Sequence, residues 1–368
     1  VCGYRRTLFV PQTLRGRRLF LQFDGAAHIA DVYVNQKHAA THRCGYTAFR
    51  VEISDYVNYG TENQIAVRLD CTENPEIPPF GFVIDYLTYG GLYREAWLDV
   101  RPQRYIEDVF ITTPALTRAH IRVTQRGGSG AYRVRLLDRA DTCLAETQSA
   151  EPAVELDAPQ AQPWTPDSPV LYTCEVTLLD ENGQYTDTQC IRFGFRTAEF
   201  RADGFYLNGE KTFLRGLNRH QSYPYMGYAA PESLQREDAR ILKEELCCNA
   251  VRTSHYPQSQ YFIDECDRLG LLVFTELPGW QHIGDEKWKE QACENLREMI
   301  LQYRNHPSIV LWGVRINESV DDDAFYARTN AIAHELDPSR PTSGVRYIQK
   351  SSLLEDVYSC LLYTSPSP

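Results

Sequence analysis

Short apolar and alternating runs fill the first part of the chain and predict β-structure. Residues 19–23 and 30–34 are compact hydrophobic runs, residues 64–69 alternate between hydrophobic and polar side chains, and turn residues such as Asp24-Gly25 separate them. Evenly spaced short strands with turn signals between them are typical of a β-sandwich. We therefore expect residues 1–101 to form one sandwich domain.

A second β-rich region follows the first. Its clearest strands are residues 132–137 and 172–178, and the glycine-containing stretches 127–130 and 180–183 supply turns. A region of roughly 100 residues with this pattern fits an immunoglobulin-like β-sandwich. Because the region holds no cluster of titratable side chains, we expect residues 102–200 to act as a spacer.

The hydrophobic period changes after Gly204, where strands begin to alternate with helices. A helix starting at Pro231 places Leu234, Ile241 and Leu242 on one apolar stripe. Apolar runs predict strands at residues 212–216, 250–253, 271–275, 308–312 and 342–345, with a sixth near 355–358. Repeated strand–helix units with strongly apolar strands imply a parallel sheet, here a (β/α)8 TIM barrel.

The barrel is expected to be incomplete. A (β/α)8 barrel takes about 250 residues and eight strands, whereas residues 201–359 supply five to six strands. The last stretch, residues 360–368, breaks the pattern and is expected to be a tail foreign to the domain. The predicted fold class is a multidomain β plus α/β protein, with two β-sandwiches followed by part of a TIM barrel.

Composition narrows the classes of function. The chain is 43% hydrophobic and 24% charged, as in ordinary globular proteins. Its net charge of −11, without a basic cluster, argues against a nucleic-acid partner. No apolar run approaches the ~18 residues of a membrane span. The 11 cysteines lack metal-binding spacing; this favours reduced thiols and a cytoplasmic location, although a start at Val1 leaves localisation open.

The stretch around Glu318 carries the strongest chemical signal. Asn305-His306-Pro307 ends a helix, because proline lacks the amide proton that a continuing helix needs. The buried strand 308–312 follows, and Asn317-Glu318 comes a few residues after it. A carboxylic acid at the C-terminal end of a buried strand is where a TIM barrel keeps its catalytic groups. The alternative for an isolated Asn-Glu pair is a solvated loop.

This stretch resembles the acid/base motif of the family 2 glycoside hydrolases. The resemblance implies that Glu318 is the proton donor and that Asn317 binds the sugar 2-hydroxyl. The family usually reads Trp-Ser-x-Gly-Asn-Glu, and this chain has one more residue between Trp312 and Asn317.

The earlier regions resemble the same family. Gly3-Tyr4-Arg5-Arg6, Phe23-Asp24-Gly25-Ala26 and Tyr89-Gly90-Gly91-Leu92-Tyr93-Arg94-Glu95 are similar to landmarks of its N-terminal jelly-roll sugar-binding domain. The family has several dozen residues before the first of these landmarks, so we expect the N-terminus to be missing here.

The resemblance also implies sugar-binding residues after the first two barrel strands. Residues 215–220 are similar to the family's RGxNRH element and make His220 a ligand of a sugar hydroxyl. The stretch Arg252-Thr253-Ser254-His255 is similar to its R-x-SHYP element: Arg252 would hold neighbouring carboxylates, and His255 would contact substrate. The alternatives are an exposed loop histidine for His220 and a purely structural role for Arg252.

No metal and no cofactor is expected. Galactosidases of the family with a magnesium site carry Glu-x-His after the third strand, but Trp280 stands here two positions before His282. Trp280 is instead expected to stack on a sugar face. Asp85, in the loop before the Tyr-Gly-Gly landmark, is a candidate for binding sugar hydroxyls, with a plain surface aspartate as the alternative.

The nucleophile is expected to be absent from this chain. A retaining glycosidase needs two carboxyl groups about 5–5.5 Å apart, and in the family the nucleophile follows the seventh strand. Glu335 lies within a predicted helix, and Glu355 precedes a strand instead of following one. Neither fits.

The leading hypothesis is a fragment of a retaining exo-β-galactosidase that hydrolyses terminal non-reducing β-D-galactosides by double displacement. Within the resemblance, Asn218-Arg219-His220 favours the galactosidase, and a β-glucuronidase of the same family is the alternative enzyme. A non-catalytic carbohydrate-binding fragment is the alternative from another class. A β-galactoside is the expected carbohydrate partner, and the intact protein is open to homo-oligomer formation.

Overall fold

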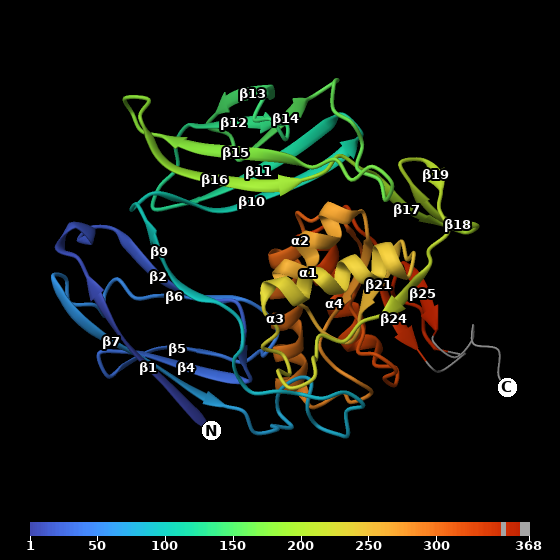
Figure 1. Ribbon diagram of the computed structural model, residues 1–368, viewed down its shortest axis with the longest axis horizontal. Helices are drawn as coiled ribbons and strands as arrows, with labels where there is room; N and C mark the ends of the chain where they lie inside the picture. Colours follow the sequence, from blue (N-terminus) through green and yellow to red (C-terminus); the bar gives the residue numbers. More distant parts are fainter. Residues whose placement is uncertain (347–350, 361–368) are drawn as a thin grey trace.

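The computed structural model describes residues 1–346 and 351–360, which form two β-sandwiches and a curled α/β sheet (Figure 1). The strands of the N-terminal sandwich are β1 (Cys2–Val10), β2 (Arg18–Phe23), β3 (Ala26–Ala27), β4 (Ile29–Val34), β5 (Lys37–His42), β6 (Phe49–Glu52), β7 (Thr61–Asp70), β8 (Gly91–Leu92) and β9 (Ala96–Arg101). A 3-10 turn, η1 (Gln12–Leu14), joins β1 to β2.

The N-terminal sandwich forms because its strands bury every second side chain. Along β7, Ile65, Val67 and Leu69 are buried while the residues between them are more exposed. The antiparallel sheet β1-β7-β4-β5 and the antiparallel sheet β6-β2-β9 share one hydrophobic core, which includes Leu21 and Val32. This is the jelly-roll sandwich that the sequence predicted.

The second sandwich also follows the alternating pattern. Its strands are β10 (Tyr105–Ala115), β11 (Arg118–Arg126), β12 (Tyr132–Leu137), β13 (Cys143–Ser149), β14 (Ala153–Asp157), β15 (Tyr172–Leu179) and β16 (Tyr185–Phe193). Sheets of order β10-β11-β14 and β13-β12-β15-β16 enclose the core, as in an immunoglobulin-like fold. A small sheet of β17 (Ala198–Arg201), β18 (Gly204–Leu207) and β19 (Glu210–Lys211) leads into the third region.

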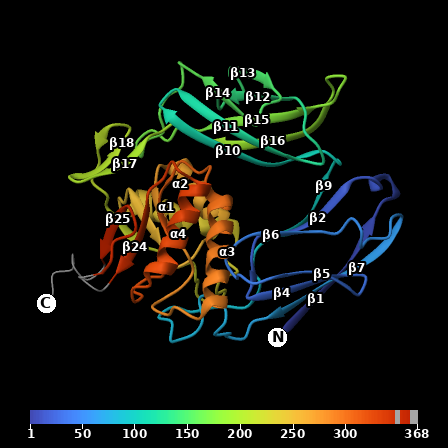
Figure 2. The ribbon, with the colours of Figure 1, turned by 180° about the vertical axis from the view of Figure 1, so that it is seen from behind.

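The third region is a six-stranded parallel sheet with helices on its outer face. Its elements are β20 (Gly216–Asn218), α1 (Glu232–Arg240), the π-helical turn η2 (Ile241–Glu245), β21 (Ala250–Thr253), α2 (Gln260–Leu269), β22 (Leu272–Glu276), α3 (Glu286–Tyr303), β23 (Ile309–Gly313), α4 (Asp323–Leu336), β24 (Thr342–Arg346) and β25 (Val357–Cys360). The strands pair in sequence order, as in part of a TIM barrel. The view from behind shows α3 beside α4 (Figure 2).

Most element predictions are confirmed within a residue or two. Gly270 ends α2 in a left-handed conformation, with φ of 73°, which glycine adopts at little cost. The strand predicted at 212–216 is wrong in position, since β20 covers only Gly216–Asn218. The Arg215 N–H donates a hydrogen bond to the Asn249 side-chain oxygen at 2.7 Å, so this backbone amide does not pair with a neighbouring strand. Apart from Cys360, the predicted tail 360–368 lies outside the described residues.

The N-terminal sandwich and the barrel sheet contact each other directly. Arg94 donates to the Asp24 and Tyr46 carbonyls on its own side, and to the Gln221 side chain and Pro257 carbonyl on the barrel side. The segment between β7 and β8 runs from the sandwich to the barrel (Figure 1). None of the helices in the described part of the chain is long and apolar enough to cross a membrane.

Candidate active site

The candidate site lies at the carboxyl ends of the parallel strands. Arg252 is on β21, Glu276 ends β22, and Asn317-Glu318 follows β23. Because neighbouring parallel strands end at one edge of the sheet, Arg252 and Asn317 are in contact there although 65 residues separate them in sequence.

Arg252 is the centre of this cluster. Its guanidinium makes two parallel hydrogen bonds to the Glu276 carboxylate, at 2.9 and 2.8 Å, and a third to Asn317 Oδ1 at 2.6 Å. His255 Nδ1 lies 2.8 Å from the same carboxylate. Arg252 is 9% exposed and Glu276 2%, so these charges interact where water screens them little.

The cluster keeps Glu276 ionised. Burial alone would raise the pKa of this carboxyl, but the Arg252 charge and the hydrogen bond from His255 outweigh burial and hold the pKa below its usual value. Glu276 is therefore a fixed negative charge behind the strand ends. Its two oxygens are already engaged with Arg252 and His255, as expected of a residue that orients its neighbours.

The Asn317-Glu318 turn is held by backbone hydrogen bonds. Glu318 has a φ of 53°, in the left-handed region that non-glycine residues rarely adopt. The Glu318 N–H donates to the Val345 carbonyl at 2.9 Å, and the Gln281 N–H donates to the Asn317 carbonyl at 2.7 Å. The half-buried Glu318 carboxylate is 3.4 Å from Gln281 Nε2. The turn thus leaves the Glu318 carboxylate partly exposed while the Asn317 side chain beside it is buried.

His220 lies beside this cluster, in the loop after β20. Its Nδ1 is 3.1 Å from the Tyr256 hydroxyl, and its ring centroid is 5.4 Å from that of His255. Although His220 is exposed, desolvation of its ring by the surrounding groups and the neighbouring His255 lower the pKa of His220 to about 4; the carboxylates of Asp85 and Glu276 oppose this shift. His220 is therefore a neutral hydrogen-bonding group at neutral pH.

The structure brings the remaining predicted residues to the same edge. Trp280 is half-buried and pairs through its backbone with Asn317. Asp85 is exposed on the loop between β7 and β8 and lies near enough for its charge to act on His220. Trp312 is fully buried and its Nε1 donates to Asp337, so it belongs to the barrel core.

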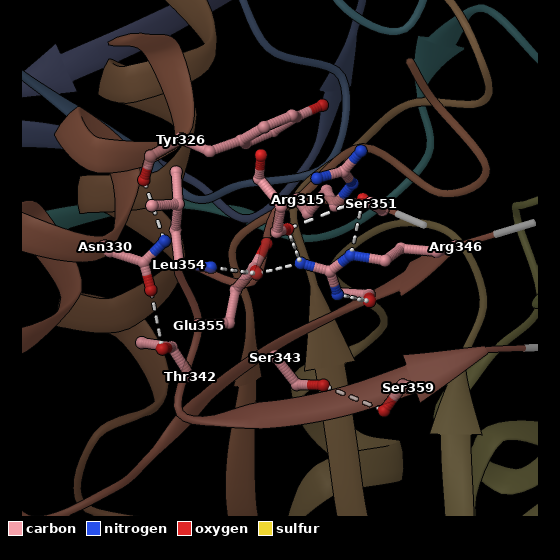
Figure 3. Close-up of polar contacts among 12 residues, drawn as sticks. Arg315, Tyr326, Asn330, Thr342, Ser343, Arg346, Ser351, Leu354, Glu355 and Ser359 are labelled. Atoms are coloured by element: carbon pink, nitrogen blue, oxygen red, sulfur yellow. Dashed lines mark hydrogen bonds and ion pairs between the residues drawn. The ribbon is translucent and has the colours of Figure 1, made fainter. Parts of the chain in front are cut away.

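Two carboxylates that follow Glu318 in sequence, Asp321 and Glu355, are bound by arginines. Glu355 precedes β25 and is buried in an ion pair with Arg346, which also donates to Ser351 Oγ and the Ser352 carbonyl (Figure 3). Asp321 accepts from Arg315 at 2.6 Å and from Ser351. Both carboxylates serve this network, in which Glu355 and the two arginines are buried.

One group of potential metal ligands occurs among the described residues. Asp264, Asp267 and His306 lie close together, but at the opposite edge of the sheet, where His306 precedes β23. His306 Nδ1 is 2.5 Å from Asp267, and Arg192 of the second sandwich pairs with Asp264. The His306–Asp267 pair lies within the barrel, and the Arg192–Asp264 pair joins the barrel to the second sandwich, so these side chains already serve ion pairs. His282, the histidine considered for a metal, has its ring against Trp288.

Sequence reasoning missed Glu276, Gln281 and Tyr86 as members of the site. Glu276 carried a usable signal, because it ends a buried strand in the same way that Glu318 follows one. Tyr86 carried none, since it comes from another domain.

Comparison with known proteins agrees with this architecture. Sequence models for three domains of glycosyl hydrolases family 2 match successive parts of the chain: the sugar binding domain at residues 1–102, the family 2 domain at 104–196 and the TIM barrel domain at 198–365. These matches, together with the barrel edge described above, define the class of protein. The chain belongs to glycosyl hydrolase family 2.

Particular relatives carry two activities in their names. A "Beta-galactosidase" of Thermoanaerobacter pseudethanolicus is 46% identical over 98% of this chain and 50% of its own length. A "Beta-glucuronidase" of Bacteroides fragilis is 31% identical over 93% of this chain and 54% of its own. The solved beta-glucuronidase 3 of Bacteroides uniformis superposes with a TM-score of 0.86 at 33% identity, covering 97% of this chain and 49% of that one. The chain spans about half the length of the curated relatives it matches.

Proposed function

We propose that this chain carries the sugar-binding edge and the general acid/base of a retaining exo-β-galactosidase. The observation that carries the proposal is the Asn317-Glu318 turn beside the ion-paired Arg252, His255 and Glu276 at the strand ends. In this account Glu318 donates a proton to the glycosidic oxygen as it leaves and later removes a proton from the attacking water.

The hydrogen bonds within the cluster support roles for its neutral members. Asn317 Oδ1 accepts from Arg252, which leaves the amide N–H groups to donate to a sugar hydroxyl. His220 and His255 each use Nδ1 within the protein, on Tyr256 and Glu276, which leaves Nε2 for substrate. Trp280 would offer a ring face to the sugar, and Asp85 a carboxylate to its hydroxyls.

The nucleophile of the double displacement is proposed to lie outside these 368 residues. Glu276, Asp321 and Glu355 are each bound by arginine in the described structure. Each of the three is fixed by its arginine in a local ion pair, which it would have to break in order to move against the sugar opposite Glu318. The chain alone is therefore expected to bind a galactoside without hydrolysing it.

A galactoside is favoured over a glucuronide by two observations. The relative that is 46% identical is named a beta-galactosidase. The Arg252 charge is already balanced by the buried Glu276 carboxylate, so it attracts a substrate carboxylate less than an unpaired cation would. The β-glucuronidase remains the alternative, because several relatives carry that name.

Calorimetric titration of the chain with isopropyl β-D-thiogalactoside and with phenyl β-D-thioglucuronide tests this proposal. Neither compound is readily hydrolysed, so binding is measured without turnover. We expect the galactoside to bind at least tenfold more tightly, and His220→Ala to weaken its binding. Preference for the glucuronide would establish the alternative, and hydrolysis of p-nitrophenyl β-D-galactoside by the 368-residue chain would show that the nucleophile is within it.

A further inference from the structure

Tyr86 of the N-terminal sandwich enters the candidate site from outside the barrel. Its ring centroid lies 5.4 Å from that of His220, 5.8 Å from that of His255 and 5.2 Å from that of Tyr256. These are contact distances for aromatic rings. Tyr86 therefore touches both histidines whose Nε2 atoms are left for a ligand.

The loop that carries Tyr86 is fastened to the barrel on both sides of it. Before Tyr86, the Phe80 carbonyl accepts a hydrogen bond from Trp288 Nε1 of α3 at 2.9 Å. After it, the Leu87 carbonyl accepts from the Tyr228 hydroxyl at 2.6 Å. A ring anchored at both ends of its loop is pre-organised, and it can hold its neighbours without an ordering step when ligand binds.

We propose that Tyr86 is a positioning residue of the candidate site: its ring fixes the orientation of the His220 and His255 rings and keeps water from the face that they share. The proposal rests on the galactosidase function for its consequence, which is that both histidines meet the sugar in one fixed geometry. Tyr86 acts through the histidines and is not assigned a contact with the reacting atoms.

The charges around His220 make the effect of Tyr86 measurable. Arg252 and His255 face His220 from β21 and the loop after it, Glu276 faces it from β22, and Asp85 faces it from the Tyr86 loop. Burial among these groups is the largest cause of the low pKa of His220, about 4 against an ordinary 6.5. Tyr86 itself stays a neutral phenol, because burial raises its pKa. Removing the Tyr86 ring should admit water to His220, and the pKa of His220 should then return toward its ordinary value.

Nuclear magnetic resonance titration of the protein with isotope-labelled histidine tests the proposal, since the chain has nine histidines to resolve. In Tyr86→Ala we expect the His220 pKa to rise by about one unit or more toward 6.5. The nitrogen shifts should also change from one tautomer to a mixture. Tyr86→Phe keeps the ring and should titrate as the original protein does.

Leu87→Ala is the matched control, because Leu87 neighbours Tyr86 in the same loop but is 65% exposed. It should leave the His220 titration unchanged. An unchanged pKa and tautomer in folded Tyr86→Ala, or an equal change in Leu87→Ala, would overturn the proposal. If Tyr86→Ala does not fold, Tyr86→Gln keeps most of the side-chain volume while admitting water, and it serves the same comparison.

The titration separates this proposal from the proposed function, because it requires neither turnover nor sugar. A pKa rise in Tyr86→Ala supports Tyr86 as a positioning residue even if the chain binds no galactoside. Galactoside binding that is unchanged in Tyr86→Ala, together with an unchanged His220 titration, overturns the role of Tyr86 and leaves the galactoside proposal intact.

Discussion

Glu276 and Arg252 are charged residues that the fold has removed from water. Their ion pair is tolerated because its geometry is good: the guanidinium makes two hydrogen bonds to one carboxylate, and His255 and Asn317 take further bonds. Burial of either charge without its partner would be costly. The two residues should therefore depend on each other for stability as well as for placing Asn317.

Substituting Glu276 with Gln tests this dependence. The change keeps the side-chain shape but leaves the Arg252 charge buried without its counter-ion, and we expect a loss of about 3–5 kcal/mol in the free energy of unfolding. Urea unfolding measures the loss. Glu52→Gln is the control, because Glu52 pairs with Arg18 near the surface, where such a pair contributes only about 0–1 kcal/mol. Equal losses in the two variants would contradict the account.

The site residues differ in how far sequence alone could reveal them. Arg252 lies near the end of a buried strand, and His255, Asn317 and Glu318 follow such strands; the rule that parallel strands present function at their carboxyl ends reaches all of them. Glu276 obeys the same rule and was overlooked. Tyr86 could not be found this way, because no local pattern links residue 86 to residues 220 and 255 in another domain.

At the scale of elements, the residues that end α3 also bind the second sandwich. The sequence predicted the stop at Asn305-His306-Pro307, and α3 ends at Tyr303. The structure adds that Asn305 binds β10 of the second sandwich, accepting from the Ile111 N–H at 2.9 Å and donating to the Val109 carbonyl at 2.7 Å. This docking was not predictable, because its partners lie about 194 to 196 residues away.

The neighbouring His306, which pairs with Asp267 inside the barrel, makes the stability of this edge depend on pH. Burial alone would lower its pKa, but Asp267 outweighs burial and holds the pKa of His306 above the ordinary 6.5. A raised folded pKa gives stability that is complete below about 6.5 and is lost as pH rises through the folded value. We expect the melting temperature to fall as pH rises above about 6.5, and to fall less in His306→Gln. Parallel pH profiles for the two proteins would contradict this assignment.

At the scale of the whole molecule, buried arginines join the domains. Arg94 bridges the N-terminal sandwich and the barrel, and Arg196 extends from the second sandwich to the carbonyls of Pro307 and Ile309. The predicted fold class is confirmed, because local periodicity determines strands and helices. The contacts between domains depend on single side chains, which periodicity does not reveal.

Arg94→Met should weaken the contact between the N-terminal sandwich and the barrel. The substitution keeps an apolar stem but removes the donors to four acceptors, and we expect a loss of about 2–3 kcal/mol in the free energy of unfolding. Denaturant unfolding followed by tryptophan fluorescence measures the loss. Arg118→Met is the control, since Arg118 pairs with Asp157 on the exposed surface of the second sandwich. An equal loss of unfolding free energy in Arg118→Met and Arg94→Met would argue against a special role for Arg94 in the contact between the domains.

The central claim is that Glu318 is the general acid. The most direct test compares Glu318→Gln with the unaltered residue in a catalytically active protein that contains this chain, using methyl and 2,4-dinitrophenyl β-D-galactosides. Methanol is a poor leaving group that needs the proton, so we predict a loss of about 10²–10⁴-fold in kcat/KM for the methyl galactoside. Dinitrophenolate leaves without a proton, and its loss should be far smaller. Equal losses for the two substrates, or no loss for the methyl galactoside, would contradict the claim.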